Sequence, residues 1–211
     1  LADPYHNFKS TLVVTSQSGS KDNIYAQMAQ VLCGNYADGT IRPFDSSGSL
    51  SSTSDANKMK EVYFLNFARL LTKDEIKKGT FEIKLGTGGS YTDPFQNVVK
   101  LYDSGAASTF KVNSPAGEFG VLYADDVTVD GSYPNGVHTT HKNTTPVGLV
   151  FYQAGIAVIS SSVFYDSGSD GILSDSDVFV GDGTTPGVHQ TKAQFIETSI
   201  SGNCDNLRHR I

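Results

Sequence analysis

The stretch VGLVFYQAGIAVISSSVF, residues 147–164, is the longest apolar run of the chain and does most to decide its fold class. A membrane-spanning helix needs about 20 continuous apolar residues. This run is broken by a glutamine, two glycines and three serines, and nothing beside it resembles an interfacial anchor. We therefore predict a strand, a turn about Gln153-Ala154-Gly155 and a second strand, and no membrane contact.

Segments of the same kind recur along the chain. Residues 60–67 are rich in β-branched and aromatic side chains, and residues 81–85 alternate between apolar and charged ones, which predicts a strand with one wet face. Further strand candidates are residues 12–15, 98–102, 109–112, 119–123 and 178–180. Turn pairs such as Asp130-Gly131 and Asn135-Gly136 separate several of them. The pattern predicts a mainly β fold, an antiparallel sandwich or barrel-like domain with one or two short helices.

One helix is predicted near the N-terminus. Ile24, Met28, Val31 and Leu32 recur at helical spacing, and Gly34 suits the C′ position.

A single helical turn is expected within residues 70–79, where Thr72 and Glu75 form a capping-box pattern, whereas residues 45–54 have the composition of a flexible Ser/Gly loop. We divide the chain into an N-terminal segment (1–57) with the short helix and this loop, a β-rich domain (58–200) and a last segment (201–211) that leads into a further section.

The composition favours a folded domain and argues against nucleic-acid binding. Of 211 residues 38% are hydrophobic, with 12 Phe and 10 Tyr, which is enough to bury a core. The formal net charge is −6, and residues 112–191 hold nine acidic residues and one basic residue. A groove that follows phosphates needs clustered Lys and Arg, so no nucleic-acid partner is expected. Cys33 and Cys204 lack disulfide-framework or CxxC spacing and are expected to be free thiols.

Residues 166–177 are the cation candidate of the sequence. Positions 1, 5, 9 and 12 of the calcium-loop template hold Asp166, Asp170, Ser174 and Asp177, and position 6 is a glycine that permits the sharp turn. Position 3 is a glycine, position 12 is shorter than the usual Glu, and the flanks have strand character. We therefore favour a solvated loop, with calcium as the alternative, and predict no other cofactor.

Three other motifs are interpreted as structure rather than chemistry. Tyr123-Ala124-Asp125-Asp126 matches the two-metal turn of reverse transcriptases, but that chemistry needs a third carboxylate and a basic channel, so we predict a hairpin turn. His138 and His141 lack a third ligand for zinc. Residues 86–90 (GTGGS) lack the Lys-Ser/Thr of a P-loop and are expected to form a turn. No catalytic residue is predicted.

Three longer stretches are similar to a known group of proteins. They are YFLNFARLLTKDEIKKGTFEIKLG (63–86), NSPAGEFGVLYADD (113–126) and the apolar run 147–164. Together they resemble a large structural protein of T4-like cyanophages and related marine tailed phages. In that family the protein is much longer, and residues 204–211 look like the lead into its next section. The resemblance implies a virion component and offers no catalytic residues to carry over.

Two functions follow as expectations. The resemblance implies a non-enzymatic structural component of a tailed bacteriophage particle, located in the virion and assembled with other virion proteins as a homo- or hetero-oligomer. The alternative is an extracellular adhesion or glycan-binding β-module, in which Tyr91, Tyr102 or Tyr133 stacks on a sugar and calcium in residues 166–177 assists. The apolar run is expected in the core, with a subunit contact as its alternative.

Overall fold

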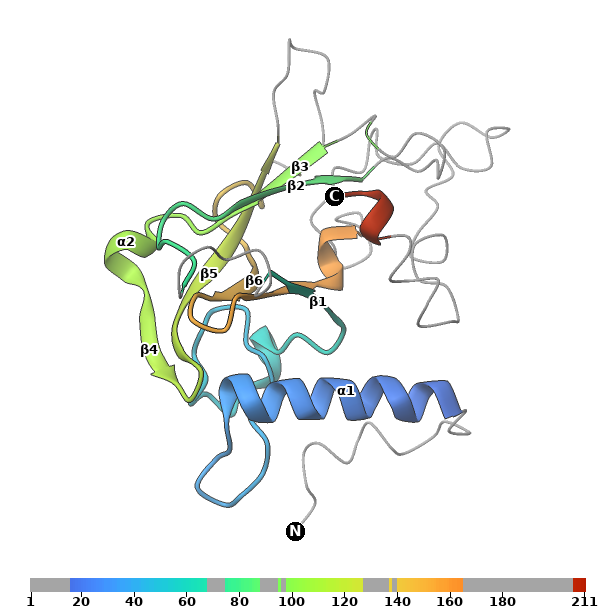
Figure 1. Cartoon of the computed structure of the whole chain (residues 1–211), viewed down its shortest axis with the longest axis vertical. Coiled ribbons are helices and arrows are strands. Elements are labelled where there is room, and N and C mark those ends of the chain that lie inside the picture. The colour runs from blue at the N-terminus through green and yellow to red at the C-terminus, as the bar shows by residue number, and fades with distance from the viewer. Residues whose placement is uncertain are drawn as a thin grey trace.

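One antiparallel sheet of seven strands, curled into a half-barrel, dominates the structure (Figure 1). The computed structural model describes residues 16–67, 75–87, 95, 98–126, 137, 140–164 and 207–211. The strands are β1 (Val62–Asn66), β2 (Glu82–Gly86), β3 (Val98–Tyr102), β4 (Lys111–Ser114), β5 (Gly117–Asp126), β6 (Pro146–Phe151) and β7 (Ile156–Ser160). They are ordered β1-β7-β6-β5-β3-β2, and β4 also pairs with β5. The prediction of a mainly β, antiparallel, barrel-like fold is confirmed.

β6 and β7 form the hairpin that residues 147–164 predict. Leu149 and Val158 are paired neighbours that face one core, while the next pair, Val150 and Ala157, faces the other. Because both faces of this hairpin are covered, every position needs an apolar side chain, which explains why the run does not alternate. The run is buried within the chain, and no helix of the described part is long and apolar enough to cross a membrane.

The two faces of the sheet bury separate clusters. The inside of the curl holds side chains from every strand except β4, together with the short 3₁₀ helix η5 (Ser161–Phe164) and Leu207 near the C-terminus. The outer face of β5, β6 and β7 is covered by the helix α1 (Ser16–Cys33) and by residues 44–59, which include the 3₁₀ helix η2 (Asp55–Asn57) (Figure 1). The N-terminal segment thus shares a core with the β-rich part.

The buried face of α1 differs from the predicted one. Of the four predicted positions, Leu32 is fully buried and Met28 packs against the same core, whereas Ile24 and Val31 are 45% and 64% exposed; Ala29, which is not among them, is also fully buried. The helix is rotated because Tyr25 points to the sheet side, where its hydroxyl donates to the carbonyl of Met59 (2.9 Å) and accepts the N–H of Phe44 (3.2 Å). The orientation of this helix thus combines apolar packing of Leu32 and Ala29 with a polar anchor at Tyr25.

The predicted C-terminal glycine of α1 is confirmed. Gly34 has a φ of 77°, and its N–H donates to the carbonyls of Ala29 and Gln30. This left-handed position ends the helix, as expected for a C′ glycine.

The predicted turn at Tyr123–Asp126 is wrong, because β5 runs straight through it. Ala124 pairs with Leu101 of β3 and faces the core, while Tyr123 and Asp125 lie on the outer side, as strand alternation requires. Asp125 stands opposite Lys100, so pairing with β3 also brings a compensating charge.

The remaining expected elements differ in their bounds or lie wholly or partly outside the described residues. β4 begins at Lys111 rather than at 109, because the short helix α2 (Ala106–Thr109) comes first. The expected strands at 12–15 and 178–180 lie outside the described residues, as do residues 70–74; residues 75–79, the described half of the expected helical turn, are not helical.

Candidate interaction surface

β4 is a short strand at the edge of the sheet. β5 pairs with β6 on one side, and on its other side with β3 and β4 in turn. Between β3 and β4 the chain leaves the sheet for residues 103–110. Within the part of the chain that the structure covers, β4 has no strand partner other than β5. Its two central side chains, Val112 and Asn113, are exposed, and Val112 is 68% exposed, the largest value among the exposed large hydrophobic side chains described.

The β4–β5 hairpin is anchored to the end of α1. The hydroxyl of Ser114 donates to the carbonyl of Leu32, one of the last carbonyls of α1 that the helix cannot satisfy itself. Pro115 lies so close to Gly34 that a Cβ added there would come within 2.9 Å of its ring. On the other side of the tip, the Gln153 side chain lies over Gly117, whose φ is 91°. The edge strand is therefore held in a fixed position.

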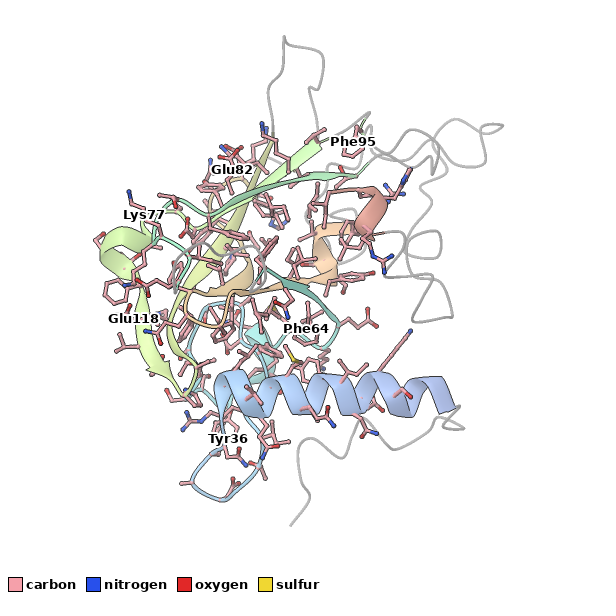
Figure 2. All side chains as sticks on the ribbon, viewed as in Figure 1. Tyr36, Phe64, Lys77, Glu82, Phe95 and Glu118 are labelled. Carbon is pink, nitrogen blue, oxygen red and sulfur yellow. The ribbon has the colours of Figure 1, made fainter. Side chains whose placement is uncertain are left out.

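Charged side chains lie on the same side of the molecule as β4. Lys77 and Glu118 are seen there, beside α2 and β4 (Figure 2). The ammonium of Lys78 pairs with the carboxylate of Glu118 and lies 4.8 Å from the centre of the Phe110 ring. This pair is solvent-accessible and adds little stability, so it contributes a polar rim rather than a structural bond.

Asp103 is a buried carboxylate where β3 ends. It is 3% exposed and accepts hydrogen bonds from the N–H groups of Gly79 (2.7 Å) and Phe81 (3.1 Å) and from the hydroxyl of Tyr152 (3.2 Å). Burial raises the pKa of Asp103 above its usual range, although these hydrogen bonds oppose the shift. The carboxylate ties residues 103–110 to the start of β2 and the end of β6.

A buried ion pair fixes the Ser/Gly loop at residues 45–54. Asp45 and Lys58 lie 2.9 Å apart with side chains 1% and 4% exposed. Asp45 also accepts the N–H of Ser47 (3.0 Å), and Lys58 donates to the carbonyl of Ser52 (2.7 Å). The segment 45–54 is a loop, as predicted. It is also anchored to the core, with Leu50 fully buried, which its polar composition does not indicate.

Cys33 is a free thiol in this same core, as the sequence predicts. Burial raises its pKa to about 12, so the thiol stays protonated.

The predicted chemistry falls largely outside the described residues. The structure does not describe the calcium candidates Asp166, Asp170, Ser174 and Asp177, nor does it describe Tyr91, Tyr133 and His138. In the part that is described, no three His, Cys, Asp or Glu side chains gather to hold a metal ion. His141 bonds to Thr145 Oγ1 through its Nδ1, at 2.9 Å. Tyr102 is half-exposed on the outer face of β3.

Gly86, the first residue of the GTGGS motif, is hydrogen-bonded to Arg210 near the C-terminus. The N–H of Gly86 donates to the carbonyl of Arg210 (2.7 Å), and Arg210 Nη1 donates to the carbonyl of Gly86 (3.3 Å). Leu207 is buried in the inner core next to this contact. Residues 207–211 therefore cover the end of β2 (Figure 1).

Comparisons with known proteins identify no relative. No family model, curated protein or solved structure matches the chain.

Proposed function

We propose that the chain is a non-enzymatic structural component of a tailed bacteriophage particle, held among other virion proteins by repeated contacts. The observation that carries the proposal is the exposed edge of β4, with Val112 on a hairpin anchored to α1. An exposed strand edge is a ready template for a strand of another chain. When every copy presents the same edge, many weak contacts add up to firm attachment.

The position of the phage-like stretches supports this proposal. Residues 63–86 contain most of β1 and all of β2, residues 113–126 span the end of β4 and all of β5, and residues 147–164 contain most of β6 and all of β7 and η5. The resemblance thus falls on the scaffold of the sheet. The buried ionisable groups Asp45, Lys58 and Asp103 all bond within the chain, as a rigid building block requires.

The test is to locate the chain in purified, washed particles from the phage that encodes it. Antibodies against residues 51–57, which are almost all exposed, should place gold at one fixed position on intact particles. Antibodies against the buried residues 147–152 are the matched control and should label only denatured particles. Absence of the chain from denatured particles would refute the structural role and leave the adhesion module as the remaining expectation.

The contact itself is tested by a pair of valine substitutions. Val112→Lys places a charge on the β4 edge, a change that blocks strand addition, and should reduce incorporation of the chain into particles. Val31→Lys is the matched control, because Val31 is 64% exposed and lies on α1. Equal incorporation of the two variants would exclude the β4 edge as the contact.

A further inference from the structure

The outer face of the sheet changes character along β5. Phe119 and Val121 point outward into the core beneath α1, whereas Tyr123 and Asp125, farther along the same face, are half-exposed. The switch from apolar to polar side chains marks where the cover by α1 ends. Beyond it, the outer face of β2, β3 and the second half of β5 is accessible, with Glu82 visible on it in Figure 2.

The strand register arranges this face in two rows. One row is Lys84, Lys100 and Asp125, and the next is Glu82, Tyr102 and Tyr123. Two lysines directly opposite each other are unfavourable in an antiparallel pair. Local rules are broken most often at functional sites, which makes this face a candidate for binding.

Tyr102 is the centre of a polar cluster on this face. Its hydroxyl donates to the Asn143 side-chain oxygen, and the Lys100 ammonium lies 4.9 Å from the centre of its ring. Burial and the neighbouring carboxylate of Asp125 raise the pKa of Tyr102, so its hydroxyl keeps its proton. Asn143 has a φ of 57° and is held beside β5, where its N–H donates to the carbonyl of Ala124 (3.0 Å).

We infer that this face binds a neutral carbohydrate, with a sugar ring stacked on the Tyr102–Tyr123 pair. Tyrosine rings offer a flat apolar surface to the C–H groups of a pyranose, and their hydroxyls remain hydrogen-bonding groups. The Asn143 amide, the Asp125 carboxylate and the Lys100 ammonium supply the donors and acceptors that sugar hydroxyls need. Glu82 and Asp125 balance the charges of Lys84 and Lys100, so this face has no excess of positive charge to hold the phosphates of a nucleic acid. This function goes beyond the structural role.

Affinity electrophoresis of the full chain tests the inference. Gels containing dextran, laminarin, xylan or alginate are compared with a gel free of polysaccharide. At least one neutral polysaccharide should retard the native chain, and Tyr123→Ala should bind about tenfold more weakly. Tyr36→Ala is the matched control, because Tyr36 is a half-exposed tyrosine well away from this face (Figure 2) and should bind like the native chain.

Each other outcome contradicts the inference. Retardation by none of the neutral polysaccharides would exclude the sugar site, and retardation by alginate alone would assign the face to acidic sugars through Lys84 and Lys100. Equal retardation of Tyr123→Ala and the native chain would place binding elsewhere. Asp125→Asn, which changes no side-chain volume, provides a second variant should Tyr123→Ala fail to fold. Particle incorporation is measured separately, so failure here leaves the structural role unaffected.

Discussion

Gly120 is the position where one added methyl group tests the packing of the inner core. An alanine Cβ there would lie 2.0 Å from the hydroxyl oxygen of Tyr152 and 3.0 Å from the ring carbon that carries it. Tyr152 is fully buried and its hydroxyl is bound to Asp103, so the ring cannot swing into solvent. We expect Gly120→Ala to lower the free energy of unfolding by about 3 kcal/mol, the upper end for overpacking.

A second substitution separates this clash from a general loss of stability. Tyr152→Phe alone removes a hydrogen bond to a carboxylate and should cost about 1.5–3 kcal/mol. In the Gly120→Ala background, the same change removes the atom at 2.0 Å and leaves the ring carbon at 3.0 Å as the nearest contact. The double variant should therefore be about 1–2 kcal/mol more stable than the sum of the single effects.

Urea unfolding of the four chains measures this coupling, provided that the slope with denaturant stays the same. Additive costs, equal within about 0.5 kcal/mol, would show that the Tyr152 hydroxyl does not lie over Gly120.

Three further predictions concern buried ionisable groups. Lys58→Met leaves Asp45 buried without its ammonium partner and should lower the free energy of unfolding in urea by about 3–5 kcal/mol. Lys78→Met, at a solvent-accessible pair, is the control and should change it little. Equal effects would contradict the burial of the Asp45–Lys58 pair. In a Cys204→Ser background, Cys33 should react with a thiol reagent only as the chain unfolds, because its pKa is about 12; reaction at the rate of a free cysteine would disprove its burial. Because folding raises the pKa of Asp103, this residue stabilises the native state most at low pH, and that stabilisation is lost as the pH rises through the folded pKa. The free energy of unfolding of the native chain, minus that of Asp103→Asn, should therefore increase from about pH 7 to about pH 4. A decrease over that range would contradict the raised pKa.

The sheet could be predicted from sequence where local pattern and burial agree. Residues 81–85 alternate because β2 has one wet face, and residues 147–164 do not alternate because β6 and β7 are covered on both. In each case the periodicity of the side chains reports directly on which faces are buried.

The errors arose where distant contacts override the local pattern. Two adjacent aspartates favour a turn, yet pairing with β3 keeps Asp125 and Asp126 in a strand. The rotation of α1 brings Tyr25 to a hydrogen bond with the carbonyl of Met59 and one from the N–H of Phe44, and both residues lie far along the chain. Tyr102 and Tyr123 both lie in predicted strands (98–102 and 119–123), but their position side by side depends on the register of β3 against β5, which no local pattern reports. The local pattern does not assign Asn143 to the outer face of the sheet, since its position depends on a left-handed backbone and a hydrogen bond to the carbonyl of Ala124 in β5.

The pairing of β1 with β7 has a consequence for how the chain folds. Val62 pairs with Ser160, a separation of 98 positions, while Phe151 pairs with Ile156 across a tight turn. Closing the longer loop costs about 2.6 kcal/mol more in chain entropy if the cost follows the logarithm of loop length. α1 also rests on β6 and β7, so during synthesis both α1 and β1 wait for a hairpin made about 100 residues later. Until then α1 and β1 have residues 44–59 as native partners but lack the β6–β7 face that completes their core, which makes this interval the time when a chaperone or a neighbouring chain can capture them.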